Sequence, residues 1–182
     1  VPGRALALSL SVLGNRLTQL FTNCLKYGQF PSQWKAANMV LLKKEGRPAD
    51  SPSAYRPICL LDEAGKLLEK VVADRLTKHL CQSGPNLAES QYGFRQGRST
   101  VDAILKVREI SNETLSRGGV ALAISIDIVN AFNSLPLRAI RTALLHHRVP
   151  QYLRTLVEDY LCNRRIQWRG HDGVMYGREV QC

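Results

Sequence analysis

Apolar residues recur every three or four positions along much of the chain. This spacing predicts amphipathic helices over residues 4–27, 64–80, 137–147 and 151–161. Gly28 follows the first of these segments and is a typical helix C-cap. Another helix is expected to begin at Ser99 or Thr100, both good N-cap residues, and to end at the Gly118-Gly119 pair.

Shorter apolar runs predict the strands. Residues 37–42 (ANMVLL) and 55–61 (YRPICLL) flank a polar loop with several basic residues, which predicts a hairpin with a long basic tip. Residues 120–127 (VALAISID) form a continuous apolar run, typical of a fully buried strand. Strands over 165–168 and 174–180 surround His171-Asp172-Gly173, a hairpin signal. Helices and strands together predict an α+β fold.

Composition adds a strong positive charge to this picture. The 182 residues carry 25 Lys and Arg against 15 Asp and Glu, a formal net charge of +10. Such a surplus favours an anionic partner, first of all nucleic acid, although a solvated basic surface is the simpler alternative. The five cysteines show no metal-site spacing, which indicates reduced thiols. No apolar run approaches the roughly 20 residues of a membrane span, so no membrane partner is expected.

Asp127 is the candidate for chemistry, because it ends the apolar run 120–127. A carboxylate in a buried strand is costly unless something compensates it. In one interpretation Asp127 caps the turn that follows, with its oxygens on nearby backbone amides. In the other it is a ligand of Mg²⁺, and the cation offsets the burial. Residue types alone do not decide between the two.

Four blocks of sequence, in a fixed order, resemble the reverse transcriptases of non-LTR retrotransposons. The blocks are FPSQWK with ANMVLLKKEG, YRPICLLDEAGKLLEKVVADRL, QYGFRQGRSTVDAI and AISIDIVNAFNSL. The residues in these blocks are most similar to those of arthropod R1 and jockey-like elements. The resemblance implies an RNA-directed DNA polymerase, in which two metal ions assist nucleotide transfer to a primer 3′-hydroxyl.

The resemblance also implies a fold and site residues. Residues 1–118 would form a fingers-like part and 119–182 the start of the palm of a right-hand polymerase. Asp127 matches the catalytic metal ligand, and the Ile128 carbonyl is expected to contact the same metal and the nucleotide. Phe132 matches the aromatic residue beneath the nucleotide sugar, which favours deoxynucleotides; a plain core phenylalanine is the alternative.

Basic residues match the positions that contact phosphate. Arg56 corresponds to the fingers arginine that binds the triphosphate, because its planar fork suits two phosphate oxygens. Lys43 or Lys44 matches the fingers lysine, and the sequence does not choose between them. Arg95 and Arg98 are expected to follow the template backbone. The alternative for all of them is an exposed, solvated basic side chain.

Two departures from the family pattern qualify this interpretation. Asn133 stands where the family often has Asp, with little consequence. The Gly-Pro-Gln-Gly and Tyr-x-Asp-Asp motifs are absent, and the sequence neither begins with Met nor ends beyond an expected strand. The chain is therefore expected to be a piece of a longer polyprotein and to lack polymerase activity on its own.

The implied partners are an RNA template, a DNA primer, deoxynucleotides and other domains of the polyprotein, in the nucleus. Rival interpretations are a group II intron or telomerase-like reverse transcriptase, a viral RNA polymerase, and a non-catalytic nucleic-acid-binding remnant of a decayed element. Phe132 argues against the viral RNA polymerase, which must admit a ribose 2′-hydroxyl.

Overall fold

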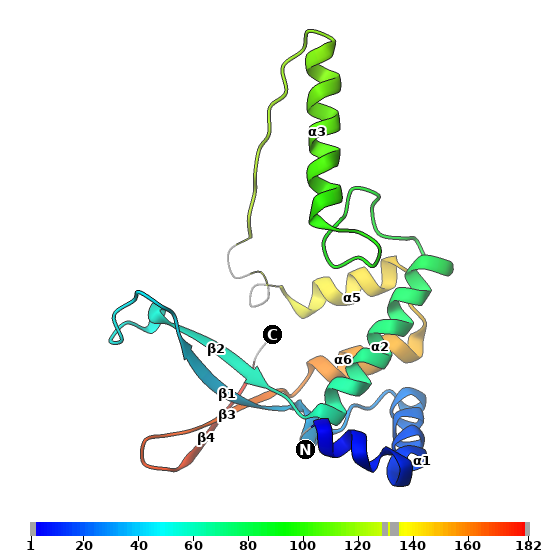
Figure 1. Ribbon diagram of the computed structural model, residues 1–182. Helices are drawn as coiled ribbons and strands as arrows, with labels where there is room; N and C mark the ends of the chain where they lie inside the picture. The colour runs from blue at the N-terminus through cyan, green and yellow to red at the C-terminus, as the bar shows by residue number, and fades with distance from the viewer. Residues whose placement is uncertain (1–2, 129–130, 132–134, 181–182) are drawn as a thin grey trace. The chain divides into compact units, whose positions relative to one another are not determined.

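A computed structural model describes residues 3–128, 131 and 135–180 (Figure 1). The chain divides into two compact units. One comprises Val1–Pro85 and Leu135–Cys182, and the other comprises Asn86–Ser134. The expected division into fingers-like and palm-like parts near residue 118 stays a prediction. In the part of the chain that the structure describes, no helix is both long enough and apolar enough to cross a bilayer.

The first unit contains a four-stranded mixed sheet in the order β2-β1-β3-β4. Its strands are β1 (Ala36–Lys43), β2 (Tyr55–Leu60), β3 (Arg165–Arg169) and β4 (Met175–Glu179). The pairs β1–β2 and β3–β4 are antiparallel, whereas β1 and β3 run parallel. Both predicted hairpins are therefore confirmed, and the sheet joins them through β1 and β3 (Figure 1).

Four helices accompany this sheet, close to where their apolar spacing predicted them. They are α1 (Gly3–Tyr27), α2 (Glu63–Gln82), α5 (Leu137–His146) and α6 (Gln151–Leu161). A 3-10 turn, η1 (Ser32–Lys35), leads from α1 into β1, and another, η2 (Pro52–Ala54), leads into β2. The Asp62 side chain caps α2 by accepting a hydrogen bond from the Ala64 N–H at 2.9 Å.

The hydrophobic core of this unit lies among α1, α2 and α6. Its buried members are Phe21, Cys24, Leu25, Phe30, Leu68, Val72, Val149, Leu153 and Leu156. Gly28 ends α1 with a φ of 65°, the left-handed conformation expected of a C-cap. A Cβ atom there would lie 2.5 Å from Thr155 Cγ2, so only glycine allows α1 to end this close to α6.

The second unit contains α3 (Thr100–Ser116), which has a complete capping box. The Ser99 hydroxyl accepts from the Asp102 N–H at 3.2 Å, and Asp102 Oδ2 accepts from the Ser99 N–H at 2.7 Å. These bonds hold Asp102 as a carboxylate and lower its pKa, the hydrogen bond from the Ser99 hydroxyl most of all. The predicted helix start at Ser99 or Thr100 is confirmed.

The predicted buried strand over residues 120–127 is wrong. This segment is not in a strand, and its apolar side chains are exposed, including Val120, Leu122, Ile124 and Ile126. A strand needs ladder hydrogen bonds from a neighbouring chain segment, and no residue that the structure describes pairs with this one. An apolar run indicates that a segment tends to be buried. It does not show which other segment would form the hydrogen bonds of a strand with it.

Candidate nucleotide and nucleic-acid site

The β1–β2 hairpin positions the three basic residues that the sequence assigned to the triphosphate. Leu42 pairs with Arg56, and Lys43 pairs with Tyr55, at the end of the ladder next to the loop that joins the two strands. Directly paired residues share one face of a sheet, and successive residues alternate between faces. Arg56 and Lys43 therefore lie on opposite faces of the hairpin.

Lys44 continues the ladder by one residue, because its N–H donates to the Ala54 carbonyl at 2.7 Å. The alternation of the strand places Lys44 on the same face as Leu42 and Arg56. Its Nζ donates to the Ser53 carbonyl at 2.9 Å in an exposed contact. The Arg56 side chain is exposed and has no hydrogen bond or ion pair within the described part of the chain. The hairpin thus presents one free guanidinium and one lightly held ammonium group on a single face.

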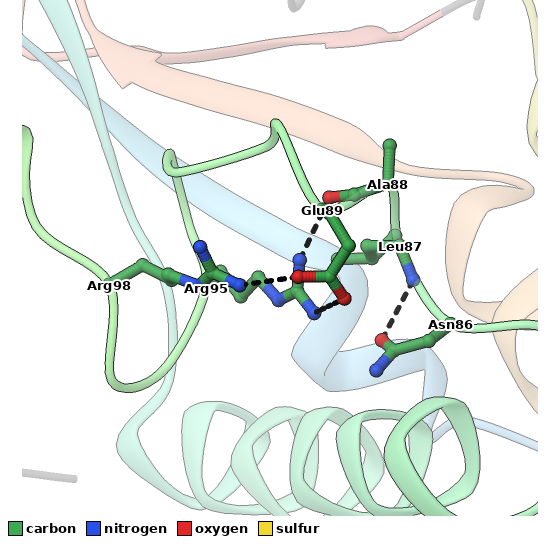
Figure 2. Close-up of polar contacts among 6 residues, drawn as sticks. All are labelled: Asn86, Leu87, Ala88, Glu89, Arg95 and Arg98. Atoms are coloured by element: carbon green, nitrogen blue, oxygen red, sulfur yellow. Dashed lines mark hydrogen bonds and ion pairs between the residues drawn. The ribbon is translucent and has the colours of Figure 1, made fainter. Parts of the chain in front are cut away.

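Arg95 and Arg98 lie together in the loop before α3, and Glu89 lies between them. Figure 2 shows the Glu89 carboxylate beside both guanidinium groups. Its Oε2 accepts from Arg98 Nη2 at 2.8 Å, and its Oε1 lies 3.8 Å from Arg95 Nη2. The sequence carries no signal for Glu89, because no periodicity connects a loop acid with arginines six and nine positions later.

Each of these arginines has a second contact that holds it in place. Arg95 Nη1 donates to the Ala88 carbonyl at 2.8 Å (Figure 2). The Arg98 guanidinium lies over the Tyr92 ring, 5.3 Å from its centroid, at a distance suited to a cation–π interaction. Both side chains are therefore largely covered, with 14% and 29% of their surface exposed for Arg95 and Arg98.

Asp127 is exposed, so burial places no penalty on its carboxylate in this structure. It makes no hydrogen bond or ion pair with any residue that the structure describes. Its carboxylate and the neighbouring Ile128 carbonyl are hard oxygen donors of the kind Mg²⁺ prefers. They fit a partial magnesium site, since two donors leave most of an octahedral shell to other groups. Phe132 lies outside the described residues.

The described side chains form no cluster of metal ligands. Among them, no three His, Cys, Asp or Glu residues gather where they could hold a metal ion. The hairpin residues Arg56, Lys43 and Lys44 belong to the first unit, whereas Arg95, Arg98, Asp127 and Ile128 belong to the second.

Lys35 supplies an ion pair that the sequence did not predict. Only 6% of this residue is exposed, and its Nζ donates to Asp159 Oδ2 at 2.9 Å. The same oxygen accepts from the Phe30 N–H at 2.6 Å. One carboxylate of α6 therefore fastens the turn between α1 and β1, which fixes where β1 begins.

Comparison with known proteins places these residues in a family. The model of the reverse transcriptase (RNA-dependent DNA polymerase) family matches residues 42–180, which include every predicted site residue. A probable RNA-directed DNA polymerase from transposon BS of Drosophila melanogaster is 34% identical over 64% of this chain and 13% of its own length.

Two further relatives are proteins of type-1 retrotransposable elements. The putative 115 kDa protein in element R1DM of Drosophila melanogaster is 37% identical over 65% of this chain and 11% of its own length. The retrovirus-related Pol polyprotein from element R1 of Bradysia coprophila is 31% identical over 86% of this chain and 15% of its own length. The chain thus spans a small part of the curated relatives it matches. On the match over residues 42–180, the chain belongs to the reverse transcriptase (RNA-dependent DNA polymerase) family.

Proposed function

We propose that this chain supplies the nucleotide-binding hairpin and one metal-binding carboxylate of an RNA-directed DNA polymerase from a non-LTR retrotransposon. The register of the β1–β2 hairpin carries the proposal, because it places Arg56 and Lys44 on one face. Two cations on one rigid face suit a triphosphate, which carries several negative charges over a short length.

Each cation has a distinct role in this proposal. The planar Arg56 guanidinium binds two phosphate oxygens at once, and the Lys44 ammonium adds a point charge. Lys44 must exchange its exposed bond to the Ser53 carbonyl for a phosphate oxygen, and the charged acceptor favours that exchange. Lys43 points from the opposite face and takes no part.

Asp127 and the Ile128 carbonyl would hold Mg²⁺ for nucleotide transfer. The bound ion would lower the pKa of the primer 3′-hydroxyl and offset charge on the phosphates. Asp127 suits this role because its carboxylate has no partner among the described residues. Phe132 would lie beneath the deoxyribose, and its bulk would exclude a ribose 2′-hydroxyl.

Arg95 and Arg98 would bind the backbone of the RNA template. Phosphate contacts of this kind position a strand without reading its sequence. A template, a DNA primer and deoxynucleotides are the partners this assignment requires, together with other domains of a polyprotein that works in the nucleus. The net charge of +10 favours binding of such anionic partners.

Steady-state kinetics of a reverse transcriptase that contains this chain test the hairpin assignment. Arg56→Ala is expected to raise the KM for deoxynucleotides about tenfold, because it removes charge-assisted hydrogen bonds. Lys44→Ala is expected to raise the KM about fivefold.

Lys43→Ala is the matched control, since it removes the same charge one residue away on the other face. Its KM should stay within about twofold of the unaltered enzyme. An equal effect of Lys43→Ala and Lys44→Ala would contradict the assignment of faces. An unchanged KM for Arg56→Ala would contradict the triphosphate role itself.

A further inference from the structure

Glu89 occupies a place between two arginines that a phosphate group would fit. One carboxylate oxygen lies at each guanidinium, at 2.8 Å from Arg98 Nη2 and 3.8 Å from Arg95 Nη2 (Figure 2). A phosphodiester also offers two anionic oxygens on one atom, and arginine binds both kinds of group through the same N–H fork. The loop therefore contains a site for one anionic group, and a residue of the chain itself fills it.

Contacts around the site hold the two arginines in place, whereas the Glu89 side chain has no other contact in the described part of the chain that holds it there. Arg95 is held by the Ala88 carbonyl and Arg98 by the Tyr92 ring, independently of Glu89. The Glu89 side chain is 85% exposed, and the two arginines are its only partners among the described residues. Because the Glu89 carboxylate itself lies largely in solvent, water and salt screen its contacts to the two arginines, and another anion can replace it.

The other nearby acid is committed elsewhere. Asp102 Oδ2 accepts from both the N–H and the hydroxyl of Ser99, at 2.7 Å each, as part of the cap of α3. Releasing it would cost α3 its N-terminal cap. Glu89 caps no helix that the structure describes, so it is the acid that an incoming anion displaces.

We infer that Glu89 competes with the template phosphate for Arg95 and Arg98, and so lowers the affinity of this loop for RNA. The inference rests on the proposed template role of the two arginines. A strand that binds must first displace the carboxylate. This competition favours a strand that contacts both arginines at once, and it weakens binding to isolated phosphates.

RNA affinity of the 182-residue chain, measured at several salt concentrations with a labelled single-stranded 20-mer, tests this. Glu89→Gln keeps the size of the side chain and removes the competing charge. It is expected to bind the RNA about threefold more tightly, because the competing ion pair is screened by solvent on the Glu89 side. The slope of log affinity against log salt should also steepen, because in the unaltered chain the displaced Glu89 carboxylate takes up cations that offset those released from the RNA.

Glu113→Gln is the matched control. Glu113 is an exposed acid of the same unit, and its Oε1 accepts from Arg117 Nη2 at 2.6 Å. It removes the same formal charge away from the loop, so it measures the general effect of a more basic chain. Glu89→Ala provides a second variant, and thermal unfolding of each verifies that the fold is kept.

The double variant Arg95→Ala with Arg98→Ala separates the inference from the function beneath it. If the double variant binds RNA more weakly and Glu89→Gln binds more tightly than Glu113→Gln, the inference holds. If the arginines matter but Glu89→Gln equals Glu113→Gln or weakens binding, Glu89 is only a loop contact and the inference fails. If the double variant binds RNA normally, the template role fails, and the inference falls with it.

Discussion

Lys35 is a buried cation whose ion pair holds the segment between α1 and β1 against α6. The Asp159 carboxylate is its only partner among the residues described, and it also accepts from the Phe30 N–H. Without Asp159, the buried Lys35 ammonium group would have no counter-charge in the described part of the chain. This loss destabilises the fold by more than an exposed ion pair stabilises it.

Asp159→Ala is therefore expected to lower the free energy of unfolding by about 2 kcal/mol, as measured by urea denaturation. Glu158→Ala, one residue away, is the control. Its contact to Arg141 Nε is 3.5 Å long and exposed, so its loss should cost less than about 0.5 kcal/mol. Equal losses for the two variants would show that the Lys35–Asp159 pair is not special.

Asp172 and Tyr176 form a second informative pair, at the β3–β4 turn. The Tyr176 hydroxyl donates to Asp172 Oδ2 at 2.7 Å, which lowers the pKa of Asp172 and raises the pKa of Tyr176. The Asp172 contribution to stability is present above the unfolded pKa of about 3.9 and is lost as pH falls through the lowered folded pKa. The Tyr176 contribution is present below its unfolded pKa of about 10 and is lost as pH rises through the raised folded pKa.

Asp172→Asn should bring the pKa of Tyr176 back toward 10, because the hydroxyl then faces a neutral acceptor. Ring NMR signals of Tyr176 followed from pH 8 to 12 measure this directly. Glu179→Gln, an acid of β4 that contacts Arg165 instead, should leave the Tyr176 titration unchanged. An unchanged pKa of Tyr176 in the Asp172→Asn variant would rule out the hydrogen bond.

At the scale of elements, local patterns predicted most of the fold. The apolar spacing of α1 and α2, the Ser99 cap and the Gly173 turn each act over a few residues, so the sequence alone reveals them. The prediction of a strand over residues 120–127 failed because strand pairing depends on a segment far away in the sequence, which no local pattern encodes.

The same distinction applies to the candidate site. Arg56, Arg95, Arg98 and Asp127 became candidates through the resemblance of their sequence blocks to the family, and their roles stay predictions. Our proposal prefers Lys44 to Lys43 because of the ladder, since the pairing of Leu42 with Arg56 determines which face each lysine takes. Glu89 and the Lys35–Asp159 pair needed three-dimensional contacts, because each joins residues that no repeat relates.

At the scale of the whole molecule, the proposed work is divided between the two units. The first unit carries the hairpin face with Arg56 and Lys44 that we propose binds the triphosphate, and the second carries Asp127 and the arginine pair. Binding of RNA depends on many spread cations, whereas catalysis depends on a few oxygen donors at one place. A substitution at Asp127 should therefore separate the two activities.

The most direct test is single-turnover primer extension, together with RNA binding, by a reverse transcriptase that contains this chain with Asp127→Asn. Extension should fall more than about 100-fold, because metal ligation is worth several kcal/mol of transition-state stabilisation. The dissociation constant for RNA should stay within about twofold of the unaltered enzyme, as it should for the exposed-acid control Glu113→Gln. Extension that survives within tenfold, or RNA binding that falls in parallel with it, would contradict the account.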